Sequence, residues 1–134
     1  GRLGCFAAGC DYGTSSGLPW AVTFTSDYAY QNIGLPLNVS LHPVQLYESA
    51  GAFFLFLLLL RLHASRGFQG QIFATYLMGY GVLRFVNEFF RGDRDRGLLF
   101  DGNISVHQLI AAALVVAALL VFYFGRSKSS LGRA

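Results

Sequence analysis

Three long apolar runs restrict the fold of this chain more than any other feature of its sequence. They cover residues 44–62, 70–90 and 105–124. Each is close to the length of about 20 residues that a helix needs to cross a bilayer. A buried helix of a soluble protein would explain one such run. Three runs in 134 residues favour an all-α membrane protein with three transmembrane helices.

The composition supports this fold class and excludes several functions. Hydrophobic residues make up 54% of the chain and charged residues 13%, about half the charged share of a typical soluble domain. The net charge of +3 comes from scattered basic residues, so we expect no nucleic-acid partner. The cysteine and histidine spacing matches no metal site, and we expect neither a metal nor a cofactor.

Local signals mark where two of the helices begin. Pro43 suits the first turn of a helix, where its missing N–H costs nothing. The letters SVHQ form a capping-box pattern, with Ser105 at the N-cap and Gln108 three residues later. The other two histidines besides His42 stand at span ends, and we assign them no role. They are His63 and His107.

The distribution of Lys and Arg predicts an orientation. With three spans, the loop 63–69 and the tail 125–134 lie on the same side of the membrane. Together with their flanks they carry five basic residues and no acidic ones, which places them in the cytoplasm. The polar or interfacial segment 1–43 and the loop 91–104 then face outward. The five basic residues are Arg61, Arg66, Arg126, Lys128 and Arg133.

A polar stripe runs along the second apolar run. Tyr80, Arg84 and Glu88 recur every fourth residue and fall within an arc of about 80° on a helix. A charge at the centre of a span costs about 2.5–3.5 kcal/mol on insertion scales, so such residues face a bundle interior or a wet cavity. An intrahelical Arg84–Glu88 pair with a structural role is one explanation. Arg91 beside the same arc favours a functional cavity instead.

Other polar residues are expected at the same outer level. They are Arg2 in the front segment and His42, Gln45 and Glu48 near the start of the first span. Three arginines around one cavity suit an anionic ligand with planar oxygens, such as a phosphate. His42 is either a helix-end residue or a functional one. The predicted site comprises Arg2, His42, Gln45, Glu48, Tyr80, Arg84, Glu88 and Arg91.

The front segment leaves two alternatives open. Gly9, Gly13 and Gly17 are four residues apart, which allows close helix packing or a loop that approaches a ligand. Cys5 and Cys10 are a disulfide, buried small residues or reactive thiols. A disulfide requires a loop, because in a helix their Cα atoms would lie about 7.5 Å apart. A thiol-redox function has no further support, since no CxxC motif is present.

Several ordered motifs match one family. GRLGCFAAGCDYG, LPWAV, HPVQLYES, YGVLRFVNEFFRGD and SVHQL occur in this order. The chain resembles the prolipoprotein diacylglyceryl transferase family over nearly its whole length, and is similar to that family's C-terminal portion. The resemblance implies a bacterial inner-membrane enzyme of seven spans, with a cytoplasmic C-terminus and a periplasm-facing active site. It implies transfer of the diacylglyceryl group of phosphatidylglycerol to a prolipoprotein's lipobox cysteine thiol, releasing glycerol phosphate.

The family's opening motif is only partly kept. The resemblance makes Arg2 a phosphate-contacting arginine and Gly13 the closing glycine of that motif. Cys5 and Cys10 replace an Asn and a Glu, which suggests a divergent branch. A non-catalytic lipid- or partner-binding membrane homologue is therefore the alternative function.

Two further motifs carry the family's polar residues, and the second motif's three are required for activity. The general-base histidine of the family precedes the matched portion, which leaves His42 as the only local candidate. The matching residues are His42, Gln45 and Glu48 in the first motif and Tyr80, Arg84 and Glu88 in the second.

Overall fold

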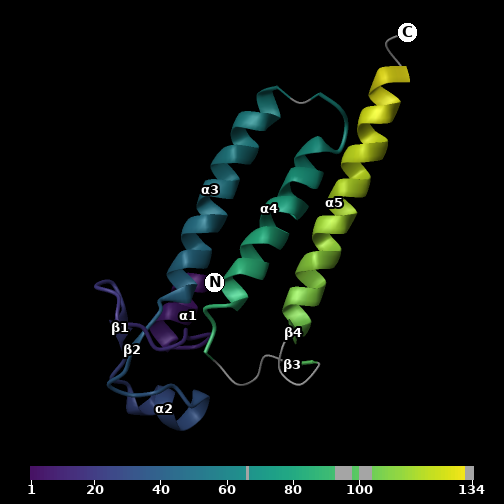
Figure 1. The fold of residues 1–134 in the computed structure, drawn as a ribbon. Coiled ribbons are helices and arrows are strands. Elements are labelled where there is room, and N and C mark those ends of the chain that lie inside the picture. The colour runs from purple at the N-terminus through teal and green to yellow at the C-terminus, as the bar shows by residue number, and fades with distance from the viewer. Residues whose placement is uncertain (66, 93–97, 100–103, 132–134) are drawn as a thin grey trace.

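Three long helices form the body of the protein in a computed structural model. They are α3 (Val44–Ala64), α4 (Gln71–Glu88) and α5 (Val106–Leu131). α4 lies between the other two, and the three helices alternate in direction (Figure 1). The structure describes residues 1–65, 67–92, 98–99 and 104–131, and only the backbone of residues 98–99 and 128–131.

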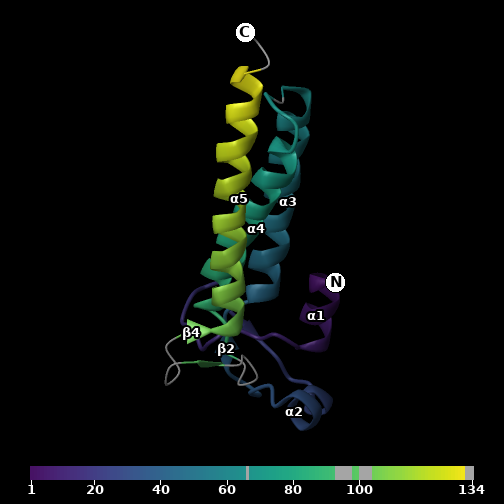
Figure 2. The same cartoon turned by 90° about the vertical axis from the view of Figure 1, so that its right-hand side faces the viewer.

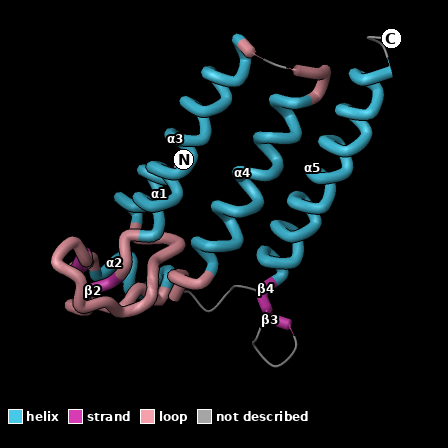
Figure 3. Tube along the Cα trace, turned by 45° about the horizontal axis from the view of Figure 1, so that its top comes forward, coloured by secondary structure: helices cyan, strands magenta, loops and turns pink. Residues whose placement is uncertain are grey.

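The short elements gather at one end of the three helices (Figures 1 and 2). The turn between α3 and α4 and the C-terminal end of α5 lie at the other end. β1 pairs antiparallel with β2, and β3 with β4. Figure 3 shows the loops of the front segment collected beside the start of α3. The short elements are α1 (Arg2–Ala8), β1 (Val22–Thr23), α2 (Asp27–Ile33), β2 (Ser40–Leu41), β3 (Leu98–Leu99) and β4 (Ile104–Ser105).

Within the described residues, two helices are long and apolar enough to cross a membrane. They are α3 and the Val106–Ser127 part of α5, and only 17% of the most apolar window of each is buried. A core helix of a soluble protein would be mostly buried. Large apolar side chains instead cover the outer faces, among them Phe53, Phe54 and Ile110, which suits contact with lipid. The chain is thus a mostly helical membrane protein.

The expected second span differs from these two helices. α4 has 18 residues, and its last two turns contain Arg84, Asn87 and Glu88. It is not among the helices that pass the test of length and apolar character. A span over 70–90 therefore stays a prediction.

The last helix is longer than the predicted span. It continues to Leu131 instead of ending at residue 124. Basic side chains such as Arg126 favour this continuation, since cations stabilise the C-terminal turns of a helix. Two of the basic residues used to predict the orientation lie outside the described residues. They are Arg66 and Arg133.

The predicted helix starts agree with the structure. α3 begins at Val44, with Pro43 at its N-cap position. The capping box is confirmed, because the backbone N–H of Ser105 donates to Gln108 Oε1 at 3.0 Å and that of Gln108 donates to Ser105 Oγ at 3.1 Å. This pair fixes the residue at which α5 begins.

Small residues let α3 and α4 approach each other. A side chain at Gly51 would meet that of Leu83, and one at Gly79 would meet that of Leu55. Each leucine therefore packs over the backbone of the facing helix, as is common between membrane helices. This packing brings Glu48 on α3 level with Arg84 on α4.

Candidate functional site

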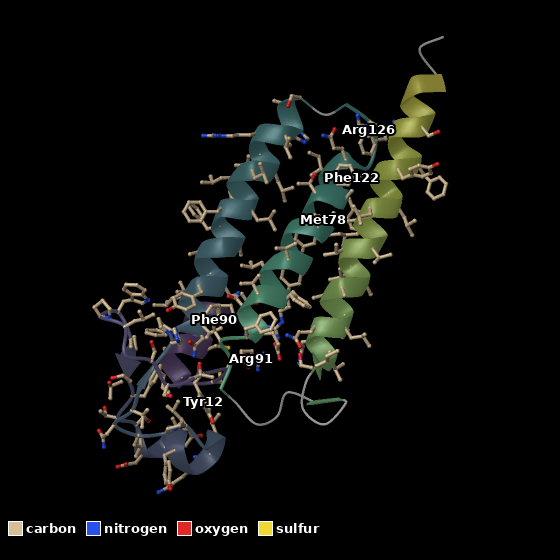
Figure 4. All side chains as sticks on the ribbon, viewed as in Figure 1. Tyr12, Met78, Phe90, Arg91, Phe122 and Arg126 are labelled. Atoms are coloured by element: carbon tan, nitrogen blue, oxygen red, sulfur yellow. The ribbon has the colours of Figure 1, made fainter. Side chains whose placement is uncertain are left out.

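Charged side chains gather where the front segment passes the ends of α3 and α4. Figure 4 shows Arg91 and Phe90 at this end, close to Tyr12, whereas Phe122 and Arg126 lie toward the opposite end of α5. We call the first of these the charged end. We call the opposite end, at the turn between α3 and α4, the turn end.

Five charged residues at the charged end form one continuous chain of ion pairs, here called the arginine–carboxylate chain. Arg91 Nη2 lies 2.7 Å from Asp11 Oδ1, and Arg2 Nη1 contacts Asp11 Oδ2. Arg2 Nε lies 3.1 Å from Glu48 Oε1, and Arg84 Nη1 lies 3.2 Å from Glu48 Oε2. Each carboxylate thus joins two arginines, and the chain connects α1, α3 and α4.

This chain is nearly buried at Arg91, Glu48 and Arg84 and more open at Arg2 and Asp11. The side chains of Arg91 and Arg84 are 6% and 11% exposed, while those of Arg2 and Asp11 are 29% and 31% exposed. Burial acts to lower the pKa of Arg2, but the carboxylates of Glu48 and Asp11 outweigh it and raise that pKa. Arg2 therefore stays charged.

Arg84 settles one alternative left by the sequence. It forms its ion pair across the helix interface with Glu48 rather than along α4. Glu88 lies one turn further along and is buried, as is its neighbour Asn87. The intrahelical Arg84–Glu88 pair is therefore not what holds Arg84.

A cleft of about 1220 Å³ opens at the charged end. Its walls come from the front segment, the end of α4 and the start of α5. Arg84 and Arg91 reach it, while Tyr80 lies elsewhere on α4 and stacks on Tyr76, with ring centroids 5.9 Å apart. The lining residues that bear on the argument are Asp11, Tyr12, Gly13, Arg84, Arg91 and His107.

Gly13 allows the front segment to cross under the helix ends. Gly13 pairs with Arg91 in an isolated antiparallel bridge. A Cβ at Gly13 would collide with the carbonyl oxygen and Cβ of His42. Because α1 ends at Ala8, the spaced glycines belong to a loop and not to a helix-packing face.

His42 takes part in a hydrogen-bond chain with two aromatic residues. Trp20 Nε1 donates to the Tyr47 hydroxyl at 2.9 Å, and that hydroxyl lies 3.2 Å from His42 Nδ1. Since Tyr47 accepts from Trp20, its own hydrogen can be given to Nδ1. This arrangement favours the His42 tautomer with hydrogen on Nε2.

Gln45 holds the front segment. It is 1% exposed, and its Nε2 donates to the carbonyl oxygen of Cys10 at 2.7 Å. The bond fixes the backbone directly before Asp11. Gln45 therefore holds the backbone of the segment that brings Asp11 into the arginine–carboxylate chain.

Both cysteines are free thiols. Cys5 lies in α1, and the Cys10 Sγ donates to the Cys5 carbonyl oxygen at 3.6 Å. Burial, then the neighbouring Cys5 and Asp11, raise the pKa of Cys10 to about 11. A thiol that stays protonated at neutral pH is a poor nucleophile, which is unfavourable for redox chemistry at this position.

Two residues of the site were missed by sequence reasoning. Asp11 joins Arg2 to Arg91, yet nothing in its sequence position signals a partner 80 residues away. His107 lines the cleft from the first turn of α5, and its buried Nδ1 makes no hydrogen bond to any described residue. Its position inside a capping box, at the level of the predicted polar stripe, was the available signal.

Comparison with known proteins identifies the family. Residues 1–124 match the family model described as prolipoprotein diacylglyceryl transferase. The chain belongs to the prolipoprotein diacylglyceryl transferase family. No solved structure matches it.

Curated relatives carry the name phosphatidylglycerol–prolipoprotein diacylglyceryl transferase. The protein of Clostridium tetani is 39% identical over 127 residues, which are 94% of this chain and 47% of the relative. That of Finegoldia magna is 38% identical over 90% of this chain and 43% of the relative. That of Bordetella avium is 37% identical over 97% of this chain and 47% of the relative. The chain therefore spans a little under half the length of these relatives.

Proposed function

We propose that the native protein containing this chain transfers the diacylglyceryl group of phosphatidylglycerol to the lipobox cysteine of a prolipoprotein. The thiol sulfur forms a C–S bond to the terminal glycerol carbon of the diacylglyceryl group, and the C–O bond from that carbon to the phosphate breaks. Glycerol phosphate leaves with the electron pair, and the thiol proton passes to a base. The names of relatives 37–39% identical to the chain support this reaction.

The arginine–carboxylate chain beside the cleft is the observation that carries the proposal. Arg84 and Arg91 both reach the cleft, and Arg2 is linked to Arg91 through Asp11. Guanidinium groups match phosphate oxygens with pairs of parallel N–H donors. Held in place by carboxylates, they offset the charge that develops on the leaving phosphate oxygen without having to reorganise.

The remaining predicted residues take supporting roles in this proposal. Glu88 and Tyr80 orient the glycerol hydroxyls of the substrate, and Glu48 fixes Arg2 and Arg84. We assign His42 a catalytic role. In the tautomer that Tyr47 favours, its Nε2–H donates to a substrate oxygen. We assign the proton acceptor to a base outside this chain.

Gln45, Gly13 and Arg91 complete the headgroup site. Gln45 and Gly13 shape the segment that carries Asp11, and Arg91 faces the phosphate. We therefore assign all three residues to substrate binding.

The proposed setting is the inner membrane of a bacterium. α3, α4 and α5 are then three of seven spans, the charged end faces the periplasm, and the turn end faces the cytoplasm. The basic residues described at the turn end, Arg61 and Arg126 among them, support this orientation. A reporter fused after Ala134 is expected to be active only if it works in the cytoplasm.

The reaction is tested with the native protein in detergent, phosphatidylglycerol labelled in its acyl chains, and a lipobox peptide. We expect label on the peptide and an equimolar release of glycerol phosphate. A matched peptide with serine in place of cysteine should acquire no label. Binding of the lipid without any transfer would reject the enzyme and support the non-catalytic lipid-binding homologue.

A further inference from the structure

We propose that Asp11 is a positioning residue, which links Arg91 in the wall of the cleft to Arg2 and so holds the Arg91 guanidinium toward a phosphate group. This inference rests on the proposed headgroup site. Asp11 Oδ1 accepts from Arg91 Nη2 at 2.7 Å, and Oδ2 accepts from Arg2 Nη1. One carboxylate thus connects Arg2, in the first turn of α1, to Arg91, which follows α4.

The backbone of Asp11 is held from both sides. The carbonyl before it accepts from Gln45 Nε2 at 2.7 Å, and the carbonyl of Tyr12 accepts from the Gly92 N–H at 2.9 Å. Asp11 itself has a φ of 55°, a left-handed conformation that Asp and Asn tolerate better than most residues. The carboxylate therefore has a fixed place, and it fixes the two arginines in turn.

The position of Asp11 favours a role in ligand binding over a purely structural ion pair remote from the cleft. Asp11 and Arg91 both line the cleft. A guanidinium group has five N–H donors, so one bond to a carboxylate does not use up its capacity to bind. Ordering a long side chain on binding costs affinity, and the anchor at Asp11 lowers that cost for Arg91.

The test compares three variants of the native protein. Asp11→Asn keeps a residue that tolerates the left-handed backbone but removes the charge. Asp11→Glu keeps the charge but lengthens the side chain. Asp27→Asn is the matched control, because Asp27 is exposed in the first turn of α2.

For Asp11→Asn we expect the KM for phosphatidylglycerol in mixed micelles to rise by about 10–100-fold, since Arg91 loses its preorganisation. The KM for the lipobox peptide should stay the same, and kcat should change by less than about threefold. Asp11→Glu should recover part of the lipid KM, and Asp27→Asn should behave like the parent. The dissociation constant for the same micelles, measured by calorimetry, should follow the lipid KM.

Three results would overturn the proposal. A lower lipid KM in Asp11→Asn would mean that the carboxylate competes with the phosphate. An unchanged lipid KM would mean that it does not position the arginines. Equal losses for lipid and peptide, together with a lower Tm, would mean a purely structural role. If the parent binds the micelles but transfers nothing, the enzyme proposal fails while the dissociation constants still test Asp11.

Discussion

Arginine side chains have opposite environments at the two ends of the helical bundle. At the charged end, Arg84 and Arg91 are nearly buried and each contacts a carboxylate. At the turn end, Arg61 and Arg126 are exposed. The turn end has a groove of about 900 Å³ whose walls include Leu59, Phe68 and Tyr76. Phe68 also packs edge-on against Phe122, with ring centroids 5.8 Å apart.

This difference teaches which arginines matter for chemistry. Removing a charge from water is costly unless the charge is paired with good geometry, so exposed arginines at a membrane face need no further explanation. They set orientation. Arginines that are nearly buried, paired with a carboxylate and adjacent to a cleft are better explained by a ligand that needs them. The predictions below break or sharpen this contrast.

The largest expected effect separates an arginine of each end. Arg84→Ala should lower kcat/KM for transfer by about 10²–10⁴-fold, because breaking a buried pair costs about 3–5 kcal/mol. Arg126→Ala should leave kcat/KM unchanged, since Arg126 is exposed at the turn end. The measurement is the initial transfer rate divided by the amount of inserted protein. Arg94, in the predicted loop 91–104, would be a further control for Arg84, but it lies outside the described residues.

Lysine variants sharpen the same comparison. Arg84→Lys should recover only part of the rate, because an ammonium group cannot offer two parallel N–H donors. Arg126→Lys should match the parent. Equal behaviour of the Arg84 and Arg126 variants would make the arginine–carboxylate chain a structural feature only.

The second effect concerns thiol reactivity. With a pKa raised to about 11, Cys10 should be alkylated about 100-fold more slowly at pH 8 than an ordinary thiol. Its rate should climb as the pH rises toward 11, because only then does the thiolate accumulate. The comparator is Ser65→Cys, an exposed position at the turn end, followed by mass spectrometry. Equal rates at pH 8 would contradict the raised pKa of Cys10.

The third effect concerns the close approach at Gly13. Gly13→Ala should destabilise the protein by about 1–3 kcal/mol, since overpacking forces the backbone apart. The added Cβ would collide with the His42 carbonyl oxygen. Gly67→Ala is the turn-end control, where the Cβ would lie an ordinary 3.6 Å from Gln71 Oε1. Thermal unfolding in detergent measures both, and an equal Tm for the two variants would reject the tight crossing.

The smallest effect comes from a helix cap. Ser105→Ala should cost about 1 kcal/mol, because it removes the hydroxyl that accepts from the Gln108 N–H. Ser65→Ala, at the C-cap of α3, should have no measurable effect. Hydrogen exchange in the first turn of α5 checks the difference. Unchanged protection there after Ser105→Ala would show that β4 alone fixes this helix start.

Much of the fold could be predicted from the sequence because its signals are local. The apolar runs located α3 and α5, and the SVHQ capping box placed the start of α5. The polar spacing of Tyr80, Arg84 and Glu88 correctly marked α4 as the helix that carries buried charge. The apolar run did not report the end of α5, because the helix continues past residue 124 to Leu131 through a basic segment.

The site was harder to predict because it depends on long-range contacts. That Arg84 pairs with Glu48 instead of Glu88 follows from how α3 packs on α4, which spacing along one helix does not report. Asp11 stands beside Cys10, where the family motif has a Glu, and only the left-handed backbone at Asp11 brings its carboxylate to Arg2 and Arg91. No local pattern encodes that turn.

The central claim is that the charged end, and not the turn end, holds the phospholipid headgroup. The most direct test is photo-crosslinking of the native protein with phosphatidylglycerol that carries a diazirine on its headgroup glycerol, followed by peptide mapping. The account predicts adducts on residues 10–15, 84–92 and 105–108, and their loss when unlabelled phosphatidylglycerol is added in excess. Adducts concentrated on residues 67–73 at the turn end, or spread evenly over α3 and α5, would contradict it.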